Sequence, residues 1–252
     1  MIPVSAVLIT YNEERHIRAA LDSVAWADEV VVVDAGSTDR TAEICRACGV
    51  RLLLQKWPGY TEQKRYATAQ AAHDWVFSLD ADERVSPELA AAIAAWRAAG
   101  DPAYAGYRMP RKAFFLGRWI RHTSWYPDYQ LRLFDRRRGG WQGGAVSESV
   151  RVSGPVGPMR GELYHYSFND LSDWLARADR YATLSAVDYR AQGRVVPPWA
   201  LLAHPAAAFL KSYVAKRGFR DGVPGLIVSV LCAVFVFLKY AKLWEARNLH
   251  NR

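Results

Sequence analysis

The chain has 252 residues, of which 51% are hydrophobic and 23% are charged. This composition is too apolar for a disordered chain and too mixed for a protein built from several membrane spans. Three cysteines cannot build a disulfide framework, so we expect a reducing compartment. The first residues, MIPVSAVLITYNEE, lack the basic start and the cleavage site of a signal peptide, and we expect no such leader.

The first hundred residues alternate between strand-like and helix-like segments. Short apolar runs predict strands at 4–10, 28–36, 50–55 and 74–82. Helical patterns predict helices at 13–25, 41–48, 59–72 and 87–100. The second strand contains four consecutive valines, which indicates a strand that is buried on both faces. This alternation predicts an α/β fold with a doubly wound, parallel sheet.

The rest of the chain follows different patterns. Residues 104–168 lose the helical period, and we expect a mixed β region that lies against the edge of the sheet. Apolar side chains at helical spacing predict one amphipathic helix over 170–193. We therefore expect one α/β domain over 1–193 and a helical appendage over 194–252.

The appendage carries most of the positive charge. The formal net charge is +8, and residues 194–252 hold nine basic against two acidic side chains. Two apolar segments, 197–210 and 223–238, are each followed by cations. The second has only sixteen uncharged residues, fewer than the roughly 20 that span a bilayer. We expect both segments to lie in the interface of an anionic membrane, with a single span or a buried helix as the alternatives.

Polar residues follow three of the predicted strands. These clusters are Thr10–Glu13, Asp34–Asp39 and Asp80–Glu83. Parallel strands end at one edge of a sheet, where α/β proteins bind their ligands. The chain contains neither G-x-G-x-x-G nor G-x-x-x-x-G-K-[ST], which disfavours a classical dinucleotide fold and a P-loop nucleotidase. We therefore expect a nucleotide whose phosphates are neutralised by something other than a glycine-rich loop.

Asp80 and Asp82 are candidates for that neutralisation. Two carboxylates at the end of a strand can hold Mg²⁺ or Mn²⁺ through oxygen, with positions left open for phosphate. Such an ion offsets the charge of a departing diphosphate. Acidic residues also gather before helices for purely structural reasons, so the pair gains its meaning from the neighbouring clusters.

Four segments then resemble a known family. LITYNEE, VVVDAGSTDRT, QKRYA and LDADE, in this order and spacing, resemble the family 2 inverting glycosyltransferases with the GT-A fold. WYPDYQLRLFDRR, AVSESV, LYHYSF and the basic apolar tail resemble the subgroup that adds glucose to the lipopolysaccharide inner core. The resemblance covers nearly the whole chain. It implies a mixed GT-A sheet, with a nucleotide-sugar-binding half over 1–100 and an acceptor half over 101–169.

The resemblance also implies roles for residues on the donor side. The loop Thr10, Tyr11, Asn12 and Glu13 would cradle the base and ribose of a UDP-sugar. Asp34 would bind the uracil or ribose, and Arg65 would lie near the diphosphate. Asp80 and Ala81 would face the ribose and donor sugar. Asp82 would be the principal ligand of the metal ion, with Asp80 and His165 as further candidates.

On the acceptor side, the resemblance implies that Glu148 is the general base. It would remove the proton of an acceptor hydroxyl that attacks from the face opposite UDP. Gln130, Arg132 and Trp125 would shape the acceptor and pyrophosphate side. The subgroup usually has His before this Glu, whereas this chain has Ser147, which weakens the assignment of Glu148.

Several of these residues also have a structural interpretation. Asp34 could cap the turn that follows it. Glu148 could be a surface acid and His165 a structural histidine, while Trp125 could serve core packing. Cys45 and Cys48 form one C-x-x-C pair without a second pair, which disfavours zinc.

The leading hypothesis is a metal-dependent glycosyltransferase on the cytoplasmic face of the inner membrane. It would move a hexose, glucose by the resemblance, from a UDP-sugar to a lipid-linked saccharide of the lipopolysaccharide core. Transfer to a polyprenyl phosphate and a non-catalytic sugar-nucleotide or glycolipid-binding module remain alternatives. Nucleic-acid binding is disfavoured because the cations flank apolar runs rather than following a groove.

Overall fold

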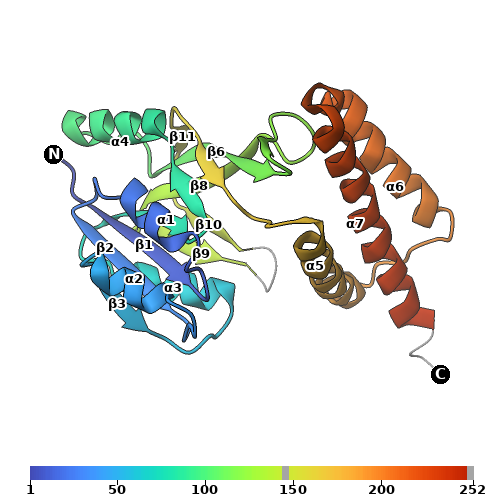
Figure 1. The fold of residues 1–252 in the computed structure, drawn as a ribbon, viewed down its shortest axis with the longest axis horizontal. Coiled ribbons are helices and arrows are strands. Elements are labelled where there is room, and N and C mark those ends of the chain that lie inside the picture. Colours follow the sequence, from blue (N-terminus) through green and yellow to red (C-terminus); the bar gives the residue numbers. More distant parts are fainter. Residues whose placement is uncertain (144–147, 249–252) are drawn as a thin grey trace. The chain divides into compact units, whose positions relative to one another are not determined.

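The computed structural model describes residues 1–143 and 148–248 (Figure 1). The chain divides into two compact units. The first unit comprises Met1–Arg111 and Asp128–Tyr166, and the second comprises Lys112–Pro127 and Ser167–Arg252. The sequence placed the helix over 170–193 with the α/β domain, whereas contacts within the structure group it with the C-terminal helices.

A parallel sheet forms the core of the first unit. Its four strands have the order β3-β2-β1-β4 and comprise β1 (Val4–Thr10), β2 (Glu29–Asp34), β3 (Arg51–Leu54) and β4 (Trp75–Asp80). All seven residues of β1 are buried, as expected for a strand that is covered on both faces.

Helices cover both faces of this sheet because successive side chains of a strand point to opposite faces. Ala6 and Leu8 of β1 belong to one hydrophobic cluster with residues of α1 (Ile17–Ser23), α2 (Thr41–Ala47) and α4 (Pro87–Ala99). Val7 and Ile9 belong to a second cluster with α3 (Tyr60–Ala69) and the strand pair β9 (Gly139–Gln142) and β10 (Ser149–Val152). The sheet is therefore doubly wound, as the sequence predicts.

The region after residue 104 differs from its prediction. It is a mixed β region, but its strands extend the sheet instead of lying against its edge. β8 (Asp128–Asp135) pairs antiparallel with β4, and β6 (Gly106–Phe115) pairs antiparallel with β8. The short strands β5 (Glu83–Val85), β11 (Val156–Pro158) and β12 (Leu163–His165) complete the sheet. The observed fold is thus mixed α/β, with the parallel half first in the chain.

Local signals place the helix boundaries well where caps are present. The hydroxyl of Ser86 accepts the N–H of Leu89 at 3.2 Å, Pro87 occupies the first turn, and Gly100 ends α4 in the left-handed conformation. The first helix was expected from residue 13 but begins at Ile17. Residues before it form a turn in which the carbonyl of Glu13 accepts the N–H groups of His16 and Ile17.

The second unit consists mainly of helices. These are α5 (Leu171–Ala191), α6 (Ala200–Leu210) and α7 (Gly222–Asn248), with a π-helical turn (Lys211–Ala215) and a 3₁₀ turn (Gly218–Asp221) between the last two. The end of β6 and the short β7 (Arg118–Trp119) also belong to it. In the described chain, the segment Gly218–Asn248 is the one helix long and apolar enough to cross a membrane.

A buried carboxylate joins the segment after β7 to the start of α7. Asp221 is 1% exposed, and its Oδ2 accepts the N–H groups of Arg121 at 3.0 Å and His122 at 2.7 Å. Its Oδ1 lies 2.9 Å from Nδ1 of His122 and 3.8 Å from Nη2 of Arg118. We call these four residues the Asp221 cluster. Within this cluster, Asp221 provides the acceptor for the backbone N–H groups of Arg121 and His122.

We expect Asp221→Ala to lower the free energy of unfolding by about 3 kcal/mol, because two backbone N–H groups lose their acceptor. The measurement is urea unfolding in detergent, followed by circular dichroism. Asp179→Ala is the matched control, since it removes an exposed partner of Lys242 and should cost less than about 1 kcal/mol. Equal effects of the two variants would contradict the structural role of Asp221.

Candidate active site

The three polar clusters that follow the strands meet at one edge of the sheet. In the parallel register Thr10 pairs with Asp34, and Ile9 pairs with Asp80. The ends of β1, β2 and β4 are therefore aligned to within about one residue. This is the arrangement that the sequence predicts, and it creates the edge at which α/β proteins bind ligands.

The first two loops brace each other. Asn12, with φ of 54°, accepts the N–H of Thr38 through Oδ1 at 2.8 Å, and the N–H of Asn12 donates to the hydroxyl of Ser37 at 2.8 Å. Asp34 accepts the hydroxyl of Ser37 at 2.5 Å and its N–H at 3.0 Å. Asp34 therefore caps its own turn here, and its role toward a base stays a prediction.

The neighbouring residues of this loop differ in exposure. Tyr11 is 55% exposed, while Thr10 is buried and its hydroxyl has no hydrogen-bond partner among the described residues. The N–H of Glu13 donates to the hydroxyl of Thr41 at 2.8 Å. The loop thus presents an aromatic side chain on a backbone that is held in place from both sides.

Asp80 lies between two buried cations. Its Oδ2 is 2.7 Å from Nη2 of Arg132 on β8, and its Oδ1 is 2.9 Å from Nζ of Lys64 on α3. Glu83 contacts the same Nη2 of Arg132 at 2.7 Å and Nη1 of Arg111 at 3.0 Å. Burial alone would raise the pKa of Asp80, but the charges of Arg132 and Lys64 outweigh it and hold that pKa well below its usual value.

Lys64 also connects Asp80 to the expected general base. Its Nζ lies 3.6 Å from Oε1 of Glu148, just before β10, and 4.4 Å from the ring centroid of Trp141 on β9. Arg132 lies 5.7 Å from the same ring. Trp141 therefore contacts both cations through its π face. Residue Ser147, which departs from the subgroup pattern, lies outside the described residues.

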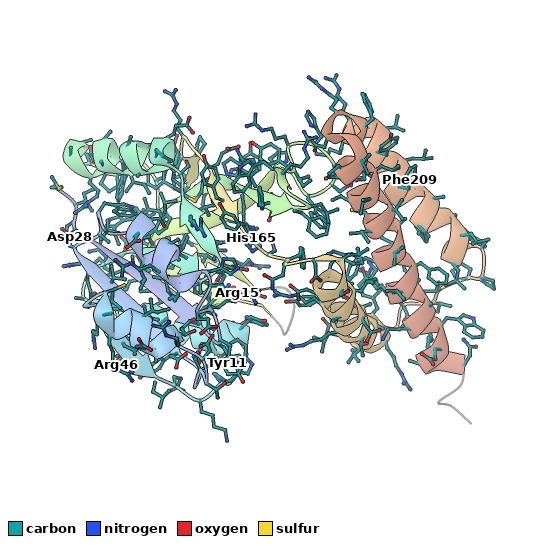
Figure 2. All side chains as sticks on the ribbon, viewed as in Figure 1. Tyr11, Arg15, Asp28, Arg46, His165 and Phe209 are labelled. Atoms are coloured by element: carbon teal, nitrogen blue, oxygen red, sulfur yellow. The ribbon has the colours of Figure 1, made fainter. Side chains whose placement is uncertain are left out.

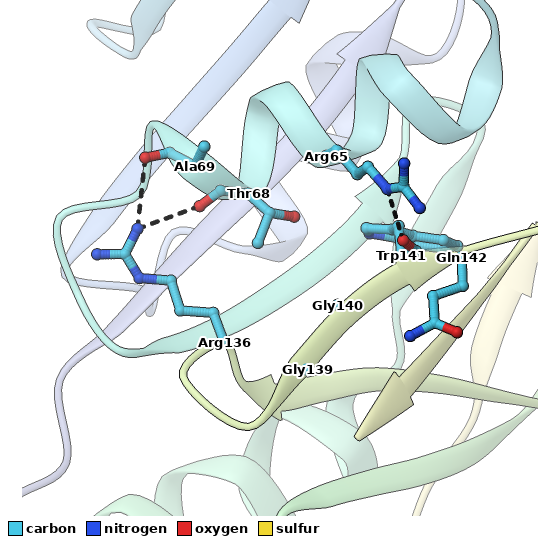
Figure 3. Close-up of a pocket in the computed structure, with 8 residues that line it drawn as sticks. All are labelled: Arg65, Thr68, Ala69, Arg136, Gly139, Gly140, Trp141 and Gln142. Carbon is cyan, nitrogen blue, oxygen red and sulfur yellow. Dashed lines mark hydrogen bonds between the residues drawn. The ribbon is translucent and has the colours of Figure 1, made fainter. Parts of the chain in front are cut away.

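Arg65, which the resemblance places near the diphosphate, has its contacts within α3 and with β9, and its role toward a diphosphate stays a prediction. Its Nε donates to the carbonyl of Trp141 at 2.8 Å, and its Nη1 lies 2.6 Å from Glu62. Figure 3 shows Arg65 in the lining of a pocket, together with Thr68, Ala69, Arg136, Gly139, Gly140, Trp141 and Gln142. The cation of QKRYA that reaches Asp80 is thus Lys64.

The spacing of residues along α3 indicates that Lys64 lies on the buried face of the helix. Thr61, Lys64 and Thr68 are all buried and follow one another at three and four residues, which places them on the sheet-facing side of α3. Arg65 is about half exposed. The buried face of the predicted helix would have selected Lys64 over its neighbour.

Arg132 carries unused hydrogen-bond donors. The residue is 1% exposed, and its Nε and Nη1 have no partner within the described part of the chain. A buried guanidinium with unpaired donors is costly, and an anionic ligand would satisfy them. Arg132 therefore fits the role on the pyrophosphate side that the resemblance implies.

Asp82, two residues after Asp80, lies close to His165. Oδ2 of Asp82 lies 3.3 Å from Nε2 of His165, which β12 positions opposite Glu83 of β5 (Figure 2). Burial favours a higher pKa for Asp82, yet the charge and hydrogen bond of His165 lower it. The carboxylate oxygen of Asp82 suits Mg²⁺ or Mn²⁺, with ligand oxygens filling the other positions, whereas the imidazole nitrogen of His165 does not suit Mg²⁺.

Both oxygens of Asp80 face cations, and its role as a further metal ligand stays a prediction. Among residues 1–143 and 148–248, no group of three His, Cys, Asp or Glu side chains is arranged to hold a metal ion. The residues present therefore fit an ion that is bound jointly with a diphosphate rather than one enclosed by the protein.

The remaining predicted residues are placed as follows. Gln130 donates to Asp128 at 2.8 Å, and Asp128 in turn pairs with Arg111 at 2.6 Å. Ala81 is buried. Trp125 belongs to the second unit, where its ring packs 5.4 Å from Phe115. Burial raises the pKa of the Cys45 thiol to about 11, which does not favour a zinc-binding thiolate.

The ion pairs of Asp80 predict a definite pH dependence of stability. Because the folded pKa is depressed, its contribution is complete above the usual value near 3.8 and is lost as the pH falls toward the folded pKa. We expect the difference in unfolding free energy between wild type and Asp80→Asn to be constant from pH 7 to about pH 5. It should shrink below about pH 4, as measured by urea unfolding. A difference that grows on acidification would contradict the ion pairs.

Comparison with known proteins identifies the family. The model of "Glycosyl transferase family 2" matches residues 5–150. The lipopolysaccharide core biosynthesis glycosyltransferase LpsC of Rhizobium meliloti is 30% identical over 100% of this chain and 95% of its own length. An uncharacterized glycosyltransferase of Rickettsia typhi is 29% identical over 97% of this chain and 88% of its own length.

Among solved structures, glucosyl-3-phosphoglycerate synthase of Mycobacterium tuberculosis, in complex with Mn²⁺, UDP and glucosyl-3-phosphoglycerate, is 26% identical. It covers 46% of this chain and 45% of its own, with a TM-score of 0.35. The matched family model and the full-length relative agree with the motifs at the edge of the sheet. The chain is an enzyme of glycosyltransferase family 2.

Proposed function

We propose that this enzyme transfers a hexose, glucose, from a UDP-sugar to a lipid-linked saccharide in lipopolysaccharide core biosynthesis. The observation that carries the proposal is the pair of buried cations, Lys64 and Arg132, around Asp80 and beside Glu148. The full-length similarity to LpsC supports the pathway, and the saccharide acceptor follows from it.

The diphosphate of the donor binds at the two cations. Nε and Nη1 of Arg132 supply charged donors that the described residues leave unused, and Lys64 adds a second positive charge at the same carboxylate. Asp82, with His165 beside it, would hold the divalent cation, Mg²⁺ or Mn²⁺. That ion, when bound, offsets the negative charge that develops on departing UDP.

Glu148 accepts the proton of the attacking hydroxyl. In an inverting displacement, the bond from the acceptor oxygen to the anomeric carbon forms while the bond from that carbon to UDP breaks. The proton moves to the carboxylate of Glu148, and no covalent enzyme intermediate is formed. Lys64, at 3.6 Å, fixes the position of this carboxylate.

The second unit brings the enzyme to its acceptor. Its exposed apolar side chains and the cations around them fit an anionic membrane surface. A lipid-linked acceptor and a nucleotide-sugar donor meet at the cytoplasmic face of the inner membrane, where we place the enzyme.

The first test is UDP release from a panel of UDP-sugars, in detergent, with Mn²⁺ or with EDTA. We expect release from UDP-glucose that requires the metal and a saccharide acceptor, and that is lost in Asp82→Ala and in Glu148→Ala. Both variants should keep the circular dichroism of the wild type. Turnover retained by Glu148→Ala would exclude it as the base and favour a phosphate nucleophile, as in transfer to a polyprenyl phosphate.

Lys64 and its neighbour Arg65 offer a matched pair of variants on one helix. Lys64→Ala removes the cation beside Asp80 and Glu148 and should lower kcat/KM by about 10²–10³-fold. Arg65→Ala removes the same charge from a side chain that bonds Glu62 and the Trp141 carbonyl, and should cost less than about tenfold. A larger loss of kcat/KM in Arg65→Ala than in Lys64→Ala would indicate that Arg65, and not Lys64, binds the diphosphate.

A further inference from the structure

By length and composition, the helix α7 could span a membrane, but its contacts with neighbouring segments oppose a span. The segment Gly218–Asn248 is apolar and long enough to cross a bilayer, and most of its apolar stretch is not buried in the protein. We infer that α6 and α7 form a hairpin that lies in the plane of an anionic membrane and enters one leaflet, and that α7 does not cross. The inference rests on the membrane association in the proposed function and adds its geometry.

The amino end of α7 is tied to a short excursion of the chain. Asp221, directly before α7, holds the N–H groups of Arg121 and His122, and the N–H of Thr123 donates to the carbonyl of Lys216 at 3.3 Å. These residues lie between the end of β6 at Phe115 and the start of β8 at Asp128.

The length of that excursion sets a limit. Twelve residues separate Phe115 from Asp128, so the farthest residue is about six residues, or about 21 Å, from either strand. The hydrocarbon core of a bilayer is about 30 Å thick. The segment cannot cross the bilayer and return, and the amino end of α7 therefore stays on the same side of the membrane as the ends of β6 and β8.

Buried polar side chains reinforce this end of the hairpin. The hydroxyl of Ser229 donates to Ser212 at 3.0 Å, and Ser212 accepts the N–H of Ser124 at 3.2 Å. Gly225 lets the first turn of α7 lie close to the backbone of the preceding 3₁₀ turn, since an added Cβ would lie 2.0 Å from the carbonyl oxygen of Gly218. The turn between α6 and α7 is thus fixed to the 118–124 segment rather than free to insert.

The far part of α7 is tied to α5. Nζ of Lys242 lies 2.7 Å from Asp179 and donates to the hydroxyl of Thr183 at 2.7 Å. Arg247 donates to the carbonyl of Arg194 at 2.6 Å, just beyond the end of α5. Ala178 and Ala186 of α5 pack against the two halves of α7, so the helices remain together along their lengths.

α5 cannot enter the hydrocarbon core with α7. Five residues separate it from the end of β12, and its sequence includes six charged side chains, namely Asp173, Arg177, Asp179, Arg180, Asp188 and Arg190. Charged residues inside a bilayer are costly unless they line a cavity. If α7 spanned the bilayer, α5 would have to enter the hydrocarbon core with it. If α7 lies in the plane of the membrane, α5 stays on the aqueous side.

The outward surface of the hairpin suits one lipid leaflet. Large apolar side chains are exposed on both helices and their connection, namely Leu202, Leu210, Val214, Phe219, Val223, Leu226, Val230, Phe237 and Trp244. Phe209 of α6 stacks on Tyr213 at 5.4 Å in the same stretch (Figure 2). The exposed cations Lys211, Lys216, Arg217 and Arg220 at the turn match anionic head groups.

The test is the sidedness of two cysteines at opposite ends of α7. Cys45, Cys48 and Cys232 are first changed to Ala, and Ala215→Cys or Glu245→Cys is then added, since both positions are exposed. Inner-membrane vesicles of a bacterial expression host are prepared inverted and right-side-out and are treated with a membrane-impermeant maleimide. We expect both cysteines to react in inverted vesicles and neither in right-side-out vesicles.

Two results would overturn the inference. Reaction of the two cysteines from opposite sides would show a span. Release of the protein from the vesicles by salt alone would show that the hairpin does not enter the leaflet. Val230→Cys serves as a depth probe, and a nitroxide attached there should be protected from a water-soluble relaxation agent and exposed to oxygen. The opposite pattern would also contradict insertion.

A further variant separates this inference from the proposed function. Val230→Glu places a charge on the exposed apolar surface and should shift the protein from the vesicle pellet to the soluble fraction. Glu245→Gln adds no charge to that surface and should leave the protein in the pellet. Labelling and pelleting need no substrate, so a protein that is silent with every UDP-sugar can still confirm the in-plane hairpin.

Discussion

The candidate active site depends on one buried set of charges, in which Asp80 lies between Lys64 and Arg132. Buried cations are tolerated when each has a close anion, and removal of a partner costs several kcal/mol, about 3–5 in measured cases. Four elements meet to satisfy this requirement: β4 carries Asp80, α3 carries Lys64, β8 carries Arg132, and β9 supplies the ring of Trp141. The carboxyl edge of the sheet is therefore polar and rigid at the same time, which suits a site that must hold a charged ligand in one orientation.

The same charges leave the site with unused donors that suit an anionic ligand, and the chain has no glycine-rich phosphate loop. Arg132 uses one nitrogen on Asp80 and Glu83 and leaves two donors unused by the described residues. The ammonium group of Lys64 lies close to the carboxylates of both Asp80 and Glu148. In the proposed function, these groups around one carboxylate would stabilise the departing diphosphate and orient the base.

The second unit uses a buried carboxylate for a different purpose. Asp221 accepts two backbone N–H groups and so fixes the 118–124 segment to the start of α7, while ion pairs and small side chains join α5 to the same helix. These contacts turn a helix that could span a membrane by composition into part of a packed helical layer. Hydropathy measures the preference of a segment for lipid, but the attachments at its two ends decide whether it can cross.

The sequence by itself determined the alternating elements, the capped ends of α4, the common edge of the polar clusters and the family, because these depend on local periodicity and on motifs within a few residues. It could not determine that Arg132 is a partner of Asp80, or that α5 groups with the C-terminal helices. Asp80 and Arg132 are 52 residues apart, and their contact exists only because β8 joins the sheet antiparallel to β4. The tertiary structure decided these points, since the pairing of distant strands and helices determines which side chains share a buried space.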